Sequence, residues 1–268
     1  MGPNPLFTNK SPEFWAAVKL VGQLIGYSDK NTNSVKIPDI DSISKKFTDK
    51  NLDPTYLIGT ALGDQVIQYL KYRADILNTT VKQSLMNKVE AEQEFNNLLA
   101  LNPKCKLPQN KQKGDKRKPA FLTCIVNILL EHSLSGKECC YDPRMLTHFI
   151  KNSKPVSVMS RRVDGAYPSV TNPKAIWEIK EYYHTTTFGS RVADGIYETI
   201  LDGTELNAVR NHGFDITHIL IIDDYNTWWV KGKSYLCRLI DALHEGHLSE
   251  LIVGRQVLIR VPELAKTW

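Results

Sequence analysis

Apolar residues recur at helical spacing through most of the first hundred residues. Ser11-Pro12 supplies an N-cap and a first-turn proline, and apolar positions then follow at intervals of three and four residues as far as Gly26. The same spacing returns three more times, the second of them from Pro54 onwards. The predicted helices are 12–26, 40–47, 54–76 and 80–101. Residues 1–101 are therefore expected to be mostly helical.

The pattern changes beyond residue 120, where helical and strand-like segments alternate. Thr217–Ile222 is almost continuously apolar, as is typical of a strand buried on both faces. The predicted helices are 121–134, a segment from Asp142-Pro143 to Ile150, 191–200 and 234–245, and the predicted strands are 155–164, 174–183, 217–222 and 256–261. This order predicts an α/β fold with a mixed sheet, helices on both faces and a mostly helical N-terminal half.

A basic segment separates the two patterns. Residues 104–119 hold seven lysines and arginines and one acid. Such a segment either contacts phosphates or is a solvated linker, and both alternatives stay open. The predicted organisation is a helical region at 1–103, which either covers the sheet or contacts DNA, a loop or linker at 104–119 and a core at 120–268.

Candidate chemistry lies where two predicted strands meet. The first ends at Asp164-Gly165, and a turn-rich segment leads to the second as a loose hairpin. Side chains alternate along a strand, so Glu178 and Lys180 share one face and Trp177 takes the other. Asp164 and Glu178 can then converge, and two neighbouring carboxylates repel each other unless a cation lies between them. Oxygen ligands of this kind suit Mg²⁺.

Asp164 followed by Glu178-x-Lys180 resembles the PD-(D/E)xK nuclease superfamily and, within it, type II restriction endonucleases. The residue before Asp164 is Val163, where the family pattern has proline. The resemblance implies that Asp164 and Glu178 bind the metal, that the Ile179 carbonyl is a further ligand, and that Lys180 handles the attacking water.

The resemblance also implies a restriction-endonuclease-like core within residues 120–268. The expected cofactor is Mg²⁺, with Mn²⁺ able to substitute, and the expected substrate is double-stranded DNA cut to 5′-phosphate and 3′-hydroxyl ends. Cutting both strands of a palindromic site favours a homodimer. This would be the nuclease of a restriction-modification system. The alternatives are a repair or conflict nuclease with structural specificity, and a non-catalytic DNA-binding module that keeps the fold.

Further DNA contacts are expected on both sides of this motif. Arg162 either reaches a phosphate or pairs with the acidic site. The segment after Lys180 is rich in hydroxyls, and Ser190 is expected to cap the next helix, whose N-terminus favours a phosphate. Asp194 and Glu198 on that helix are interpreted as surface charge. The tentative DNA-binding residues are Arg162, Thr185, Thr186, Thr187, Ser190 and Arg191.

Composition excludes several other classes. Five cysteines without a CxxC pair disfavour a secreted disulfide framework and favour a cytoplasmic protein, and adjacent Cys139-Cys140 suit a zinc site poorly. The net charge of +5 permits a polyanionic partner. No apolar segment is long enough for a membrane span, and no phosphate-binding or dinucleotide glycine motif predicts a nucleotide cofactor. Asp223-Asp224 are interpreted as a turn and Trp228-Trp229 as part of the core or of a subunit interface.

Overall fold

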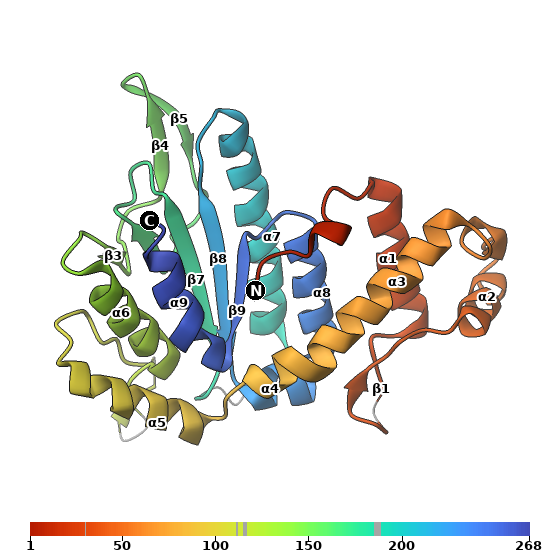
Figure 1. The fold of residues 1–268 in the computed structure, drawn as a ribbon, viewed down its shortest axis with the longest axis horizontal. Coiled ribbons are helices and arrows are strands. Elements are labelled where there is room, and N and C mark those ends of the chain that lie inside the picture. Colours follow the sequence, from red (N-terminus) through yellow and green to blue (C-terminus); the bar gives the residue numbers. More distant parts are fainter. Residues whose placement is uncertain (30, 111, 115–116, 185–188) are drawn as a thin grey trace.

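A five-stranded mixed sheet forms the centre of the computed structural model, which describes residues 1–29, 31–110, 112–114, 117–184 and 189–268 (Figure 1). Its strands, in spatial order, are β3 (Cys140–Tyr141), β6 (Gly165–Tyr167), β7 (Ala175–Glu181), β8 (Thr217–Asp223) and β9 (Glu250–Val253). The first three are antiparallel neighbours, whereas β7, β8 and β9 run parallel. Together with helices on both faces, this confirms the predicted α/β fold.

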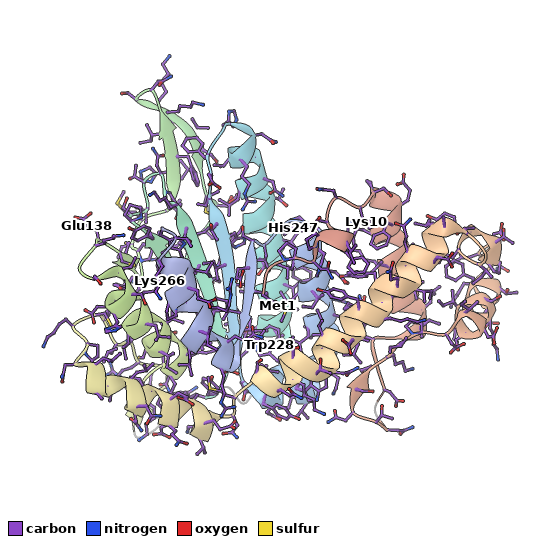
Figure 2. All side chains as sticks on the ribbon, in the orientation of Figure 1. Met1, Lys10, Glu138, Trp228, His247 and Lys266 are labelled. Carbon is purple, nitrogen blue, oxygen red and sulfur yellow. The ribbon has the colours of Figure 1, made fainter. Side chains whose placement is uncertain are left out.

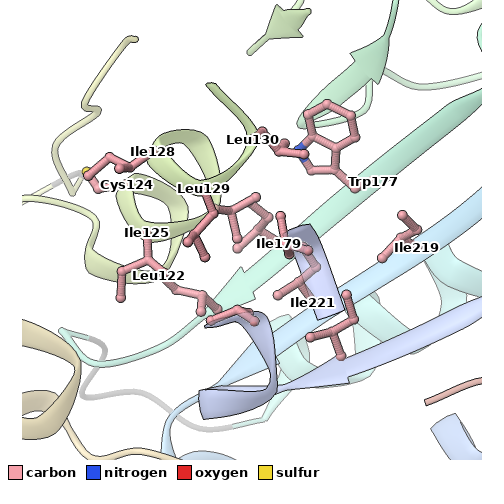
Figure 3. Packing of buried hydrophobic residues seen from close by; sticks show 14 of the residues in the cluster. Leu122, Cys124, Ile125, Ile128, Leu129, Leu130, Trp177, Ile179, Ile219 and Ile221 are labelled. Atoms are coloured by element: carbon pink, nitrogen blue, oxygen red, sulfur yellow. The ribbon is translucent and has the colours of Figure 1, made fainter. Parts of the chain in front are cut away.

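Three helices cover one face of the sheet: α5 (Lys88–Leu98), α6 (Phe121–Leu134) and α9 (Val257–Ala265). Trp177 and Ile179 of β7 pack here with Ile219 and Ile221 of β8 (Figure 3). Ten of the fourteen residues of α6 are buried in this layer. A helix in that position must be apolar nearly all round, which accounts for the uniform sequence of α6.

Two helices, α7 (Ser190–Asn211) and α8 (Lys233–His244), cover the opposite face. Leu220 and Ile222 of β8 belong to this second core. Trp228 and Trp229 are completely buried in it, so their interpretation as core residues is confirmed.

The N-terminal region has a core of its own, formed by α1 (Pro12–Ile25), α2 (Ile40–Asp49) and α3 (Ala61–Ile76). A small hairpin of β1 (Ser28–Asp29) and β2 (Ser34–Val35) joins α1 to α2, and α4 (Lys82–Ser84) follows α3. The N-terminal half is mostly helical, as expected. In the described ranges, no helix is both long and apolar enough to cross a membrane.

Two contacts fasten this region to the sheet layers. Arg73 of α3 and Asp241 of α8 form a buried ion pair at 2.8 Å, and the Tyr69 hydroxyl also donates to Asp241 at 2.7 Å. The main chain of Met1, labelled beside β9 in Figure 2, accepts a hydrogen bond from the Leu251 N–H at 3.0 Å.

The prediction was wrong for the segment before the motif. No helix begins at Asp142, and β4 (His148–Lys151) pairs instead with β5 (Lys154–Val158) in a projecting hairpin (Figure 1). Its turn places Asn152 and Ser153 at φ 53° and 60°. Residues 155–164 are not one strand either, because β5 ends at Val158. The partner of β7 is therefore the short strand β6, which begins after Asp164.

Helix boundaries and the C-terminus also differ from the prediction. Residues 256–261 form no strand; the last strand is β9, which begins six residues earlier, and Val257, Val261 and Ala265 bury one face of α9. Pro54 begins only a short 3₁₀ turn, and α3 starts after its Thr60 cap. The predicted helix 80–101 is interrupted before Asn87, whose side chain caps α5.

Candidate active site

Strand β7 places the acidic and basic residues of the motif on one face. Trp177 and Ile179 point into the α6 layer, so Glu178 and Lys180 point toward α7, as the alternation predicted. Glu178 is 5% exposed. The structure therefore places both motif side chains between the sheet and a helix.

Asp164 approaches β7 from the neighbouring chain segment, directly before β6. Its N–H donates to the Trp177 carbonyl at 3.1 Å, and its Oδ2 accepts a hydrogen bond from the Ile179 N–H at 2.8 Å. Gly165 makes this approach possible, because a Cβ at that position would lie 2.0 Å from the Trp177 ring. Asp164 and Glu178 are thus brought to the same part of β7.

The carboxylate of Asp164 responds to this neighbour. Asp164 is exposed at the surface, but many protein atoms lie near its carboxylate and reduce its hydration. Loss of hydration comes first and the charge of Glu178 second, and together they raise the pKa of Asp164 to about 6. The hydrogen bond from Ile179 and the charges of Lys180 and Arg161 act in the opposite direction. The site therefore contains more negative charge than its cations compensate.

Two cations bind one oxygen of Glu178. Lys180 Nζ lies 2.8 Å from Glu178 Oε1, and Arg161 Nη2 lies 2.6 Å from the same atom. Both cations also contact Glu198 of α7, at 2.5 Å for Lys180 and 3.2 Å for Arg161. Burial disfavours the ammonium of Lys180, but these two glutamates outweigh it and raise the pKa of Lys180 above its usual value.

Asp202, one turn beyond Glu198 on α7, holds the other arm of Arg161. Arg161 Nη1 donates to Asp202 Oδ2 at 2.6 Å, and Asp202 is 1% exposed. Burial raises the pKa of Asp202 to about 6, although the charge of Arg161 opposes this rise. The cluster thus combines four carboxylates with two cations and has a formal charge of −2 when all are ionised. One divalent cation would neutralise it.

The residues present fit such a cation. In the described ranges, no group of three or more His, Cys, Asp or Glu side chains is arranged to hold a metal. A site of two carboxylates and one main-chain carbonyl needs no such group. Glu178 Oε2 is buried and has no hydrogen-bond partner among the described residues. The Ile179 N–H points to Asp164, and the C=O of a strand residue points to the same edge as its N–H. These oxygens suit Mg²⁺, which completes its shell with water and phosphate oxygens.

The predicted DNA-binding residues lie around this cluster rather than in it. Arg162 is exposed, and the pairing with acids falls to its neighbour Arg161. Ser190 and Arg191 are exposed at the start of α7, but Gly189 and not Ser190 is the N-cap, and it makes no side-chain cap. Thr185, Thr186 and Thr187 lie outside the described residues.

Three residues of the cluster were missed or misread from the sequence: Arg161, Glu198 and Asp202. Glu198 had been interpreted as surface charge; it is half-buried and paired, whereas Asp194 is exposed. The sequence did contain a signal for these acids: Glu198, Asp202 and Glu205 follow one another at spacings of four and three residues, which places them along one side of a helix. Glu205 extends the network, because it accepts a hydrogen bond from the Ser160 N–H at 3.1 Å.

The other acids and thiols considered in the sequence have structural surroundings. Asp223 is buried and accepts hydrogen bonds from the Met86 N–H at 2.9 Å and the Asp224 N–H at 2.8 Å. Asp224 accepts from the Thr227 N–H at 2.9 Å, as in a turn. Burial is the main cause that raises the pKa of Cys139 to about 12, and burial also raises the pKa of Cys140.

Comparison with known proteins assigns domains but no activity. Residues 86–268 match the family described as "Domain of unknown function (DUF7687)", and residues 1–80 match "Domain of unknown function (DUF7690)". The first match covers more than half of the chain. No curated protein and no solved structure matches it.

Proposed function

Because the chain belongs to the DUF7687 domain family, whose description names no activity, we propose its function from the site itself. The chain is a Mg²⁺-dependent nuclease that hydrolyses phosphodiester bonds of double-stranded DNA at Asp164, Glu178 and Lys180. One observation carries this proposal: the buried Oε2 of Glu178 has no hydrogen-bond partner in the described part of the chain, and it lies beside a second carboxylate whose pKa is raised to about 6.

Each motif residue has a role that follows from its contacts. Asp164 and Glu178 would hold Mg²⁺ together with the Ile179 carbonyl, and the bound ion would supply Lewis-acid stabilisation of charge on the phosphate. An ammonium group has three N–H donors. Lys180 uses two of them on Glu178 and Glu198, so one is left to orient a water molecule.

The proposed reaction is hydrolysis by in-line attack. The oxygen of the water held by Lys180 forms a bond to phosphorus, and the bond from phosphorus to the 3′ oxygen breaks. The 3′ oxygen leaves with a proton, and the second proton of the water goes to solvent. The ends are then a 5′-phosphate and a 3′-hydroxyl, as the resemblance to PD-(D/E)xK nucleases implies. Sequence-specific cleavage by a homodimer, as in restriction-modification defence, extends the same proposal.

The test is cleavage of plasmid and phage DNA in Mg²⁺, in Mn²⁺ and in EDTA, followed on a gel. We expect discrete fragments with either metal and none in EDTA. A metal-dependent smear would favour a structure-specific or nonspecific nuclease. No cleavage of modified or unmodified DNA would leave the non-catalytic module.

Matched lysine variants assign the reaction to this site. Lys180→Ala should lower the cleavage rate at least about 100-fold, the usual effect of removing a group that stabilises the transition state, and should keep DNA binding. Lys174→Ala is the control, because Lys174 is an exposed lysine directly before the same strand. Equal rates for the two variants would refute the assignment of Lys180.

A further inference from the structure

A second charged cluster lies beside Asp164 and is basic. Asp142 pairs with the ammonium of Lys106 and, at 3.3 Å, with Arg144. The hydrogen bond from Lys106 comes first in lowering the pKa of Asp142, and the charges of Arg144 and Arg162 add to it. Two cations therefore contact one carboxylate, and the charge of a third, Arg162, acts on it without a direct contact. We call Lys106, Arg144, Arg162 and Asp142 the basic patch.

The sheet fixes the position of this patch. Tyr141 at the end of β3 pairs with Gly165, and the next residue, Asp142, donates its N–H to the Asp164 carbonyl at 2.9 Å. Asn127 of α6 holds the main chain at Lys106 through a 2.8 Å hydrogen bond to its carbonyl. The basic patch thus joins three distant chain segments directly next to a proposed metal ligand.

The side chains of the patch are open to solvent. Lys106 is 49% exposed and Arg144 75% exposed. Arg162 is exposed as well. A formal charge of +2 is left after Asp142 is counted. Long, exposed cations of this kind suit phosphate groups, whereas the half-buried cations Arg161 and Lys180 are already bound by acids.

We propose that Lys106, Arg144 and Arg162 bind the phosphates of duplex DNA that flank the phosphate to be cut. This rests on the proposed function, because it takes duplex DNA as the substrate of the neighbouring site. The charges are complementary. The polyanionic DNA backbone is attracted to the basic patch, whereas the neighbouring acidic cluster repels DNA phosphates unless it also binds a divalent cation. Asp142 competes with phosphate for the same cations.

This competition predicts opposite effects for neighbouring substitutions. Removing the cations should weaken DNA binding. It should also make binding less dependent on salt: the slope of log K against log salt should decrease in magnitude by about 0.9 for each lost phosphate contact. Asp142→Asn should instead tighten binding several-fold, because the cations lose their internal partner. Asn tolerates the φ of 52° at this position. A purely structural role of Asp142 would not increase affinity.

The experiment measures binding of a fluorescent DNA duplex to the full chain in Ca²⁺ over a range of salt concentrations. The variant is the triple Lys106→Gln, Arg144→Gln, Arg162→Gln. The charge-matched control is Lys45→Gln, Lys46→Gln, Lys50→Gln, which changes exposed lysines of α2 and of its C-cap. Figure 1 shows α2 at the opposite end of the molecule from β3.

We expect the slope to fall by about two to three for the patch variant and to change little for the control. Equal slopes, or wild-type protein that binds no duplex, would overturn the proposal. Binding with the expected slopes but without cleavage in Mg²⁺ would refute the nuclease and leave the patch standing. If the patch variant still cleaves DNA in Mg²⁺ and its salt slope equals that of wild type, the proposed role of the basic patch is refuted and the nuclease remains.

Discussion

Replacement of Asp164 by asparagine should stabilise the metal-free protein while abolishing cleavage. Asparagine removes the charge that repels Glu178, and its carbonyl oxygen can still accept the hydrogen bond from the Ile179 N–H. The sign follows from linkage. The pKa of Asp164 is higher in the folded state than in the unfolded chain, so ionisation of Asp164 destabilises the fold. This loss develops as pH rises from about 4 to about 6.

The size of the effect follows from the pKa. A rise from 3.8 to about 6 corresponds to about 3 kcal/mol at 1.36 kcal/mol per unit. Asp164 is exposed, and solvent screening reduces that figure to about 1 kcal/mol. In a chain of this size, about 1 kcal/mol shifts the melting temperature by about 2–4 °C.

The assay is thermal unfolding in EDTA at pH 7.5 and at pH 4. Asp164→Asn should melt about 2–4 °C above wild type at pH 7.5 and much closer to it at pH 4, where Asp164 is protonated in the folded state and only about half ionised in the unfolded chain. Added Mg²⁺ should stabilise wild type and have less effect on the variant. The control is Asp194→Asn, an exposed aspartate on α7. A variant less stable than wild type at pH 7.5 would refute the reasoning that repulsion dominates this site.

Three further substitutions test the supports of the site. Arg161→Ala should destabilise the protein by about 3 kcal/mol in urea unfolding, because Asp202 and Glu178 would stay buried without their shared cation. Arg161→Lys should recover part of this loss of stability. A loss below about 0.5 kcal/mol for Arg161→Ala would contradict this reasoning. Gly165→Ala should cost about 2–3 kcal/mol, because its Cβ would overlap the Trp177 ring, and unchanged stability would show that β6 can move away. Arg73→Ala should cost about 3–5 kcal/mol, because it leaves Asp241 buried without its ion-pair partner; a melting temperature equal to wild type would disprove that this pair holds α3 to α8.

Elements with an unambiguous local pattern were predictable from the sequence. Helix α6 has the predicted bounds. A helix that is apolar nearly all round is buried on every side, so its position does not depend on which face turns to the sheet. The alternation of β7 fixed the faces of Glu178 and Lys180. The approach of Asp164 to β7 was also expected, but the strand that brings it there differs. In the described sheet, the partner of β7 is β6, which follows Asp164, and not the predicted strand that ends at Asp164.

Other elements depend on contacts that local patterns do not contain. The apolar residues of 256–261 fit a strand as well as a helix, and burial of Val257 and Val261 against the sheet selects the helix. Asp142 adopts φ 52°, which ends β3 and prevents the expected helix. The longer helix expected from Pro54 fails for a local reason, because Gly59 at φ 75° and the Thr60 cap restart the chain.

The acids of α7 show most clearly why the site could only be half predicted. At 3.6 residues per turn, Glu198 and Glu205 lie about 90–110° around the helix from the centre of its buried face, whereas Asp202 lies about 50° from that centre and is buried. Residues on such a flank face solvent unless another segment packs beside them. Here the segment Ser160–Arg161 does so, and it carries the cation that binds Glu178. The motif strand alone therefore specifies the residues to which we assign the proposed chemistry, whereas the excess negative charge that favours a bound divalent cation in this proposal comes from α7.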